Sequence, residues 1–151
     1  MIDNRLKELG YSLPEVAGSS FSFVPVVIHQ GVAYVSGQLP MENGEMKMTG
    51  KLGENVSVDQ AKELAELCIL NGLSHLSAEI GTLDQVDRII KLTGFVSSAE
   101  GFNEQPVVID AASQLLEKIF GDNGKHARSA IGVAELPRSS PVEIEMIVAI
   151  K

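Results

Sequence analysis

The feature that most constrains the fold is a run of apolar residues at helical spacing that ends at Gly81. Ser57 with Gln60 three residues later matches a capping box, in which two side chains satisfy free backbone amides at the start of a helix. Small and apolar residues then recur every three or four positions, at Ala61, Leu64, Ala65, Cys68, Gly72, Leu76 and Ile80. A helix of this length with one apolar stripe indicates a layered fold in which it covers a sheet.

The rest of the chain alternates strand-like runs with a second long helix. The predicted elements are, in order, a short helix at 3–10, strands at 21–29 and 32–38, a polar loop at 41–55, the helix at 57–81, a strand at 86–98, a helix at 105–121 and strands at 127–135 and 142–150. Gln30 and Gly31 suit a tight turn between the first two strands. The order ββαβαββ predicts an α+β fold with a mixed sheet and both long helices on one face.

Size and charge limit the class of protein. A chain of 151 residues predicts a single domain, with residues 1–20 as a helical extension and linker. The 20 acidic residues against 12 basic ones disfavour nucleic acid as a partner. No window approaches the roughly 18 apolar residues of a membrane span. The one cysteine, Cys68, provides neither a disulfide framework nor a metal motif, so we expect a cytoplasmic protein without metal.

Two of the predicted strands carry unexpected charges. Arg128 shares one strand face with only small residues, namely Ala130, Gly132 and Ala134, while Glu143 and Glu145 interrupt the last strand. Burying such charges is costly without a partner. Arg128 therefore either forms a structural ion pair or faces a ligand, another subunit or a closely packed helix. The alternative for the two glutamates is that they lie on a face of the sheet that is exposed to solvent.

The separation of these charges bears on their partners. If the last two strands pair as a hairpin around Ser139, Arg128 and Glu143 lie roughly 23 Å apart at about 3.3 Å per residue. They then either have separate partners or meet between two subunits of a symmetric oligomer.

Three segments resemble the RidA/YjgF family, the reactive intermediate deaminases that are also called L-PSP endoribonucleases. These segments are YVSGQLP at 34–40, ARSAIGVAELP at 127–137 and VEIEMI at 142–147. The resemblance is closest to a longer chorismate-mutase-like subgroup. It implies a chorismate-mutase-like fold and a homotrimer with ligand clefts between its subunits.

The resemblance also implies roles for individual residues. Arg128 corresponds to the family arginine that binds the carboxylate of a small 2-imino or 2-enamino acid, which suits a planar guanidinium. Glu143 corresponds to the glutamate associated with water. Gly37, in the Ser-Gly-Gln turn, is expected to contribute backbone contacts to the ligand.

This chain departs from the family pattern at three positions of the implied cleft. Phe23 stands at the place of a tyrosine, Ala130 at the place of a cysteine, and Asp110 at the place of a helix asparagine. The added negative charge of Asp110 is expected to change which ligand is accepted. His126 lies on the same face as Arg128 if the strand has already begun there.

Three functions are consistent with these residues. The favoured one is hydrolytic deamination of 2-imino or 2-enamino acids to a 2-oxo acid and ammonia, a hydrolysis of a C=N bond that needs no metal or organic cofactor. The first alternative is an endoribonuclease or translation inhibitor of the L-PSP type, although the acidic balance and the lack of tryptophan disfavour it. The second is a non-catalytic trimer that binds a small carboxylate, and Phe23 keeps this alternative open.

Overall fold

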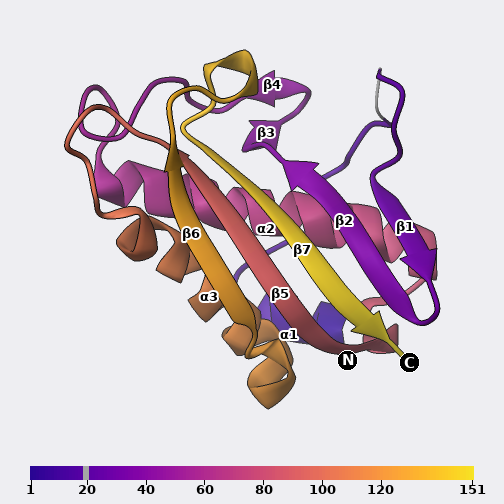
Figure 1. Ribbon diagram of the computed structural model, residues 1–151. Coiled ribbons are helices and arrows are strands. Elements are labelled where there is room, and N and C mark those ends of the chain that lie inside the picture. Colours follow the sequence, from indigo (N-terminus) through magenta and orange to yellow (C-terminus); the bar gives the residue numbers. More distant parts are fainter. Residues whose placement is uncertain (19–20) are drawn as a thin grey trace.

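The computed structural model describes residues 1–18 and 21–151 (Figure 1). The helices are α1 (Ile2–Glu8), α2 (Val58–Ile80) and α3 (Gln105–Phe120), and the strands are β1 (Val26–His29), β2 (Val32–Gln38), β3 (Met41–Glu42), β4 (Glu45–Met46), β5 (Val86–Ser97), β6 (Ala127–Val133) and β7 (Val142–Ile150). Short 3₁₀ helices occupy Leu83–Gln85, Gly121–Gly124 and Pro137–Ser139. The predicted order ββαβαββ is confirmed, with β3 and β4 added as a small ribbon inside the polar loop.

The main sheet has the order β1-β2-β7-β5-β6. Only β5 and β6 run parallel, and the other neighbours are antiparallel, so the sheet is mixed as predicted. Figure 1 shows α2 and α3 side by side behind one face of this sheet. Leu92 of β5 and Val148 of β7 are fully buried beneath these helices. The α+β fold with both long helices on one face is therefore confirmed.

The hairpin considered for the last two strands does not form, because β5 lies between β6 and β7. The helix α3 connects β5 to β6 as a parallel crossover unit, which places β6 beside β5 at the edge of the sheet. The chain then passes over the end of β5 and returns as β7 on its other side. This central position explains why β7 is so apolar.

Local signals at the element ends agree with the structure. Ser57 Oγ accepts from the Gln60 amide at 3.1 Å, and Gln60 Oε1 accepts from the Ser57 amide at 2.9 Å, which completes the capping box of α2. Gln30 and Gly31 have φ angles of 51° and 76°, the left-handed pair that a two-residue hairpin turn requires. The first helix begins one residue earlier than predicted, with Met1 at the cap position and Asp3 in the first turn.

The N-terminal extension is attached to the helix layer. The Tyr11 hydroxyl donates to Glu66 Oε2 of α2 at 2.5 Å, and burial raises the pKa of Tyr11 to about 12. The Ser74 hydroxyl of α2 donates to the carbonyl of Pro14. The end of the predicted linker, residues 19–20, lies outside the described residues. The part before it runs along α2, on the side of the molecule away from the open sheet face.

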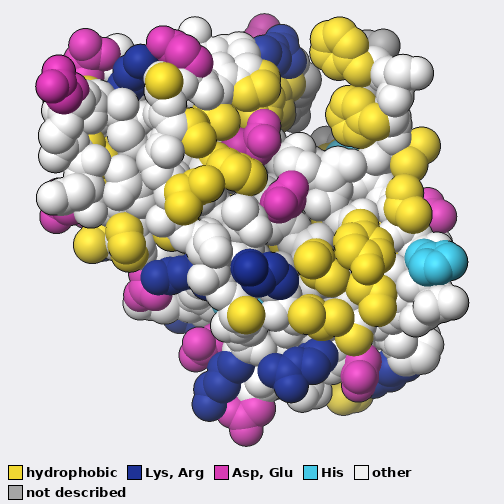
Figure 2. Space-filling view, in the orientation of Figure 1, with side chains coloured by type: hydrophobic (Ala, Val, Ile, Leu, Met, Phe, Trp, Pro, Cys, Tyr) yellow, Lys and Arg dark blue, Asp and Glu magenta, His cyan; other side chains and the backbone are white. Residues whose placement is uncertain are grey.

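The other face of the sheet is not covered by any described element of the chain. Val27, Tyr34 and Ile131 lie on this face and are 51%, 49% and 46% exposed. Val27 pairs with Tyr34, and Tyr34 pairs with Ile147 of β7, so three adjacent strands contribute apolar side chains. Figure 2 shows apolar side chains gathered on this face over β1 and β2. The sheet thus has one face packed on helices and one open apolar face.

Candidate functional site

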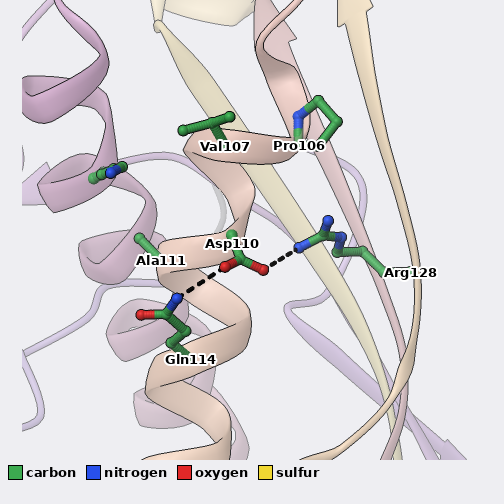
Figure 3. A pocket seen from close by; sticks show the side chains of 7 residues that line it. Pro106, Val107, Asp110, Ala111, Gln114 and Arg128 are labelled. Atoms are coloured by element: carbon green, nitrogen blue, oxygen red, sulfur yellow. Dashed lines mark hydrogen bonds and ion pairs between the residues drawn. The ribbon is translucent and has the colours of Figure 1, made fainter.

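Arg128 projects from the edge strand β6 toward helix α3 (Figure 3). Its partner in the sheet register is Leu92, a fully buried residue of the helix-covered face. Arg128 Nη1 donates to Asp110 Oδ1 at 3.0 Å and to Ser113 Oγ at 3.3 Å, both on α3. A structural ion pair, one of the alternatives left by the sequence, is therefore present within the chain.

The ion pair uses only part of the guanidinium. Nη1 makes both interactions, and among residues 1–18 and 21–151 no acceptor is bound to Nε or Nη2 of Arg128. Nε and Nη2 together form one of the two-donor edges that match a carboxylate. The Arg128 side chain is 26% exposed, so a small ligand can reach it.

A cavity of about 340 Å³ opens beside the Arg128–Asp110 pair. It is lined by Lys62 from α2, by Pro106, Val107, Asp110, Ala111 and Gln114 from α3, and by Arg128 from β6 (Figure 3). Charged and polar groups thus meet an apolar wall made by the first turns of α3. A cavity of this volume suits a ligand of a few heavy atoms.

A chain of hydrogen bonds holds the arginine from behind. His126 Nδ1 lies 2.6 Å from the carbonyl oxygen of Gly124, which can only accept, so we assign the proton to Nδ1. In the neutral imidazole Nε2 is then the acceptor, and the Ser113 hydroxyl donates to it over 2.9 Å. The same hydroxyl oxygen accepts from Arg128. His126 and Arg128 therefore contact the same serine, as their predicted common face requires.

Glu143 lies on the opposite face of the sheet. Arg128 is in register with Leu92, and Leu92 is in register with Met146 of β7. Because Glu143 is three residues from Met146 along a regularly paired stretch, its side chain points the other way. The two charges are thus separated by the sheet and not, as expected from the sequence, by the length of a hairpin.

The Glu143 carboxylate rests on Gly37. A Cβ atom at Gly37 would lie 2.7 Å from Glu143 Oε2, so only glycine allows this close approach without displacing the glutamate. Within the described part of the chain no lysine or arginine forms an ion pair with Glu143. Burial raises the pKa of the Glu143 carboxyl, and the neighbouring negative charge of Glu145 raises it further.

Phe23 lies close along the chain to residues that are hydrogen-bonded to the end of β2, where Gly37 is. Ser36, next to Gly37, donates from its hydroxyl to the Val24 carbonyl at 2.7 Å and from its amide to the Pro25 carbonyl at 2.8 Å. These bonds place the segment after Phe23 along the end of β2. The Phe23 side chain is 53% exposed.

The six residues suggested by the sequence therefore fall into two groups. We call Arg128, Asp110 and Ala130 the Arg128 half-site, because Ala130 follows Arg128 on the same strand face and packs on the core. We call Glu143, Gly37 and Phe23 the Glu143 half-site. The two half-sites do not meet within one chain.

Sequence reasoning missed three residues that surround the Arg128 half-site. Ser113 and Gln114 follow Asp110 at spacings of three and four, so helical periodicity could have placed them on its face. Lys62 comes from the other helix, and no sequence signal indicated it.

The described residues offer little else that is reactive. Across 1–18 and 21–151 no three His, Cys, Asp or Glu side chains are grouped so that they could hold a metal ion. Burial raises the pKa of the Cys68 thiol well above its ordinary value, so this cysteine is a core residue and a poor nucleophile. None of the described helices is long and apolar enough to cross a membrane.

Comparisons with known proteins bear on the family and the fold of this chain. The family model described as "YjgF/chorismate mutase-like, putative endoribonuclease" matches residues 3–148. Protein TCP17 of Trypanosoma cruzi is 40% identical over 144 residues, which cover 95% of this chain and 90% of that protein. A 2-iminobutanoate/2-iminopropanoate deaminase of Dermatophagoides farinae is 28% identical over 109 residues, 69% of this chain and 77% of that enzyme. The crystal structure of Atu1372 from Agrobacterium tumefaciens, of unknown function, has a TM-score of 0.92 and 46% identity over 99% of this chain and 92% of its own.

Proposed function

Because the chain belongs to the YjgF/chorismate-mutase-like family, we propose that it hydrolyses small 2-imino and 2-enamino acids to 2-oxo acids and ammonia. The observation that carries the proposal is that Arg128 lines a cavity of about 340 Å³ and has an unused Nε–Nη2 edge. That edge would bind the substrate carboxylate with two parallel hydrogen bonds. The relationship to a 2-iminobutanoate/2-iminopropanoate deaminase supports the same reaction.

The proposed enzyme is a homotrimer whose clefts join the two half-sites. Arg128 of one subunit would face Glu143 of the next, since the two residues lie on opposite faces of the sheet in one chain. The open apolar face that carries Val27, Tyr34 and Ile131 supports an interface between copies. Gly37 and Phe23 would enter the cleft together with Glu143.

The chemistry needs little beyond positioning. An iminium carbon is electrophilic, so water attacks it, the C–N bond breaks, a C=O bond forms and ammonia leaves. Glu143 would accept a proton from this water, and its raised pKa makes it a better base than an ordinary carboxylate. Arg128 would hold the carboxylate throughout. No step requires a metal or an organic cofactor.

We expect the enzyme to act in the cytoplasm. The buried, unpaired Cys68 is compatible with that reducing compartment.

Two observations favour a second function. Asp110 already neutralises part of the Arg128 charge, and Phe23 supplies no hydroxyl, so the same site could bind a small carboxylate without turning it over. This alternative shares the trimer and the role of Arg128 and differs only in the chemistry that follows binding.

The deaminase proposal is tested by ammonia release from 2-iminopropanoate that is generated in situ. We expect the wild-type protein to accelerate release and Arg128→Ala to lose the acceleration, because the carboxylate is no longer held. Arg5→Ala, which removes the same charge from the exposed helix α1, is the matched control and keeps the activity. Full activity in a folded Arg128→Ala variant would remove the site. Saturable, Arg128-dependent binding of 2-oxobutyrate without turnover would favour the binding function, and cleavage of RNA would favour the endoribonuclease.

A further inference from the structure

Asp110 is fixed at the cavity by two hydrogen bonds and still has capacity for more. Its Oδ1 accepts from Arg128 Nη1 at 3.0 Å, and its Oδ2 accepts from Gln114 Nε2 at 2.8 Å (Figure 3). An ionised carboxylate has about four acceptor positions, so each oxygen retains one. The side chain is 51% exposed and lines the cavity. Both residues line the same cavity, so a ligand that binds Arg128 there also meets the Asp110 carboxylate.

Among the described residues that line the cavity, two are cationic and one is anionic, and the anion lies directly against one of the cations. Arg128 and Asp110 form a pair of opposite charges, and Lys62 is the third charged residue among the described lining residues. A monoanionic ligand is attracted by Arg128 but repelled by the adjacent Asp110 carboxylate. A ligand with a positive nitrogen next to its carboxylate avoids this repulsion and satisfies both residues.

We propose that Asp110 is a specificity-determining residue that selects zwitterionic ligands, 2-iminio acids and α-amino acids, over 2-oxo acids of the same carbon skeleton. The proposal deepens the proposed function and rests on carboxylate binding by Arg128. In both favoured ligands the carboxylate and the nitrogen are on adjacent carbon atoms. They match the adjacent guanidinium and carboxylate of the Arg128–Asp110 pair, which are joined by a 3.0 Å hydrogen bond.

This selectivity has a consequence for turnover. The substrate R–C(=NH₂⁺)–COO⁻ takes up one water and gives R–CO–COO⁻ and NH₄⁺, so the bound ligand changes from a zwitterion to a monoanion. The C=N bond is replaced by a C=O bond, and both hydrogens of the water leave on the ammonium ion. Asp110 attracts the substrate nitrogen and repels the product, so it lowers product inhibition.

The test compares L-alanine with pyruvate, which share a three-carbon skeleton and a carboxylate. Their dissociation constants are measured by calorimetry at pH 7 for wild type and for Asp110→Asn, which keeps the shape of the side chain and removes its charge. We expect wild type to bind L-alanine more tightly, and the variant to lose about tenfold or more of this preference. Pyruvate should also inhibit deamination more strongly in the variant. Glu117→Gln removes the same charge from an exposed position of α3 outside the cavity and leaves the preference unchanged.

The outcomes separate this proposal from the proposed function. If the ratio of the pyruvate and L-alanine dissociation constants in Asp110→Asn stays within twofold of the wild-type ratio, the selectivity is overturned. This holds even if Arg128→Ala abolishes binding and turnover. Binding of neither ligand to wild type or variant overturns it as well. If deamination is absent but the alanine preference is present and depends on Asp110, the selectivity stands and the catalytic function fails. Asp110→Ala must change the ratio in the same direction, and circular dichroism verifies that both variants are folded.

Discussion

The two half-sites differ in how the chain provides for their charges. Arg128 has an ion-pair partner and a serine on α3, and a histidine behind them that lies just before β6. Glu143 is half-buried against Gly37, and none of the described residues forms an ion pair with it. The Arg128 charge is therefore compensated by hydrogen bonds within the chain, whereas the Glu143 charge lowers the stability of the fold.

This difference suggests what each half-site does. Satisfied charges contribute rigidity, because their geometry is over-determined by several hydrogen bonds. An unsatisfied, desolvated carboxylate is a reactive base, because burial disfavours its ionised form. We therefore assign orientation to the Arg128 half-site and proton transfer to the Glu143 half-site. Removing a group from each should have opposite effects on stability.

The largest expected effect is on activity at the Glu143 half-site. Glu143→Gln keeps the size of the side chain and removes its basicity, so we expect ammonia release from 2-iminopropanoate to fall by about 10²–10⁴-fold. Glu117→Gln is the control, since Glu117 is exposed on α3 and belongs to neither half-site. Equal activity of the two variants would place the base elsewhere and end the distinction between the half-sites.

A smaller effect is expected on stability at the Arg128 half-site. Ser113→Ala removes a buried hydroxyl that bridges His126 and Arg128, so we expect the free energy of unfolding to drop by about 1–2 kcal/mol. Urea denaturation measures this difference. Ser77→Ala in α2 controls for the change in helix propensity. A Ser113 variant as stable as the Ser77 variant would show that the network does not support the fold.

The smallest effect concerns the pH dependence of stability. Burial raises the pKa of Glu143 above 4.5, so between 4.5 and the raised pKa the folded chain binds more protons than the unfolded one. This group therefore lowers stability as pH rises through that window, and the loss is complete once the pH is above the raised pKa. Glu143→Gln should melt at a higher temperature than wild type at pH 7, by ~2 °C, because half of the side chain remains hydrated and the effect is small. At pH below 4 we expect the two proteins to melt at the same temperature. Lower melting of the variant at pH 7 would contradict an unsatisfied Glu143.

Much of the fold could be predicted because its signals are local. The capping box at Ser57 and the turn at Gln30 and Gly31 depend on neighbouring residues only, and both are confirmed. The position of β7 could not be derived in this way. Which strand lies beside which depends on the crossover through α3, a long-range property that alternation within a strand does not encode.

The candidate site was predictable only in part for the same reason. Alternation identified Arg128 and Glu143 as unusual, but the face of each relative to the other depended on the sheet register. The pairing of Arg128 with Asp110 joins residues 18 positions apart on a strand and a helix. From the sequence, an ion pair is one of several alternatives for Arg128, because no local pattern specifies a partner across layers.

The central claim, that one site is assembled from half-sites of two subunits, is tested most directly by mixing two inactive variants. Arg128→Ala supplies an intact Glu143 half-site, and Glu143→Gln supplies an intact Arg128 half-site. When the two are unfolded together and refolded, random assembly into a symmetric ring gives about one quarter of clefts with both intact halves. We therefore predict about a quarter of wild-type ammonia release from the mixture and almost none from either variant alone. A mixture of well-folded, exchanged subunits that stays inactive would contradict the account.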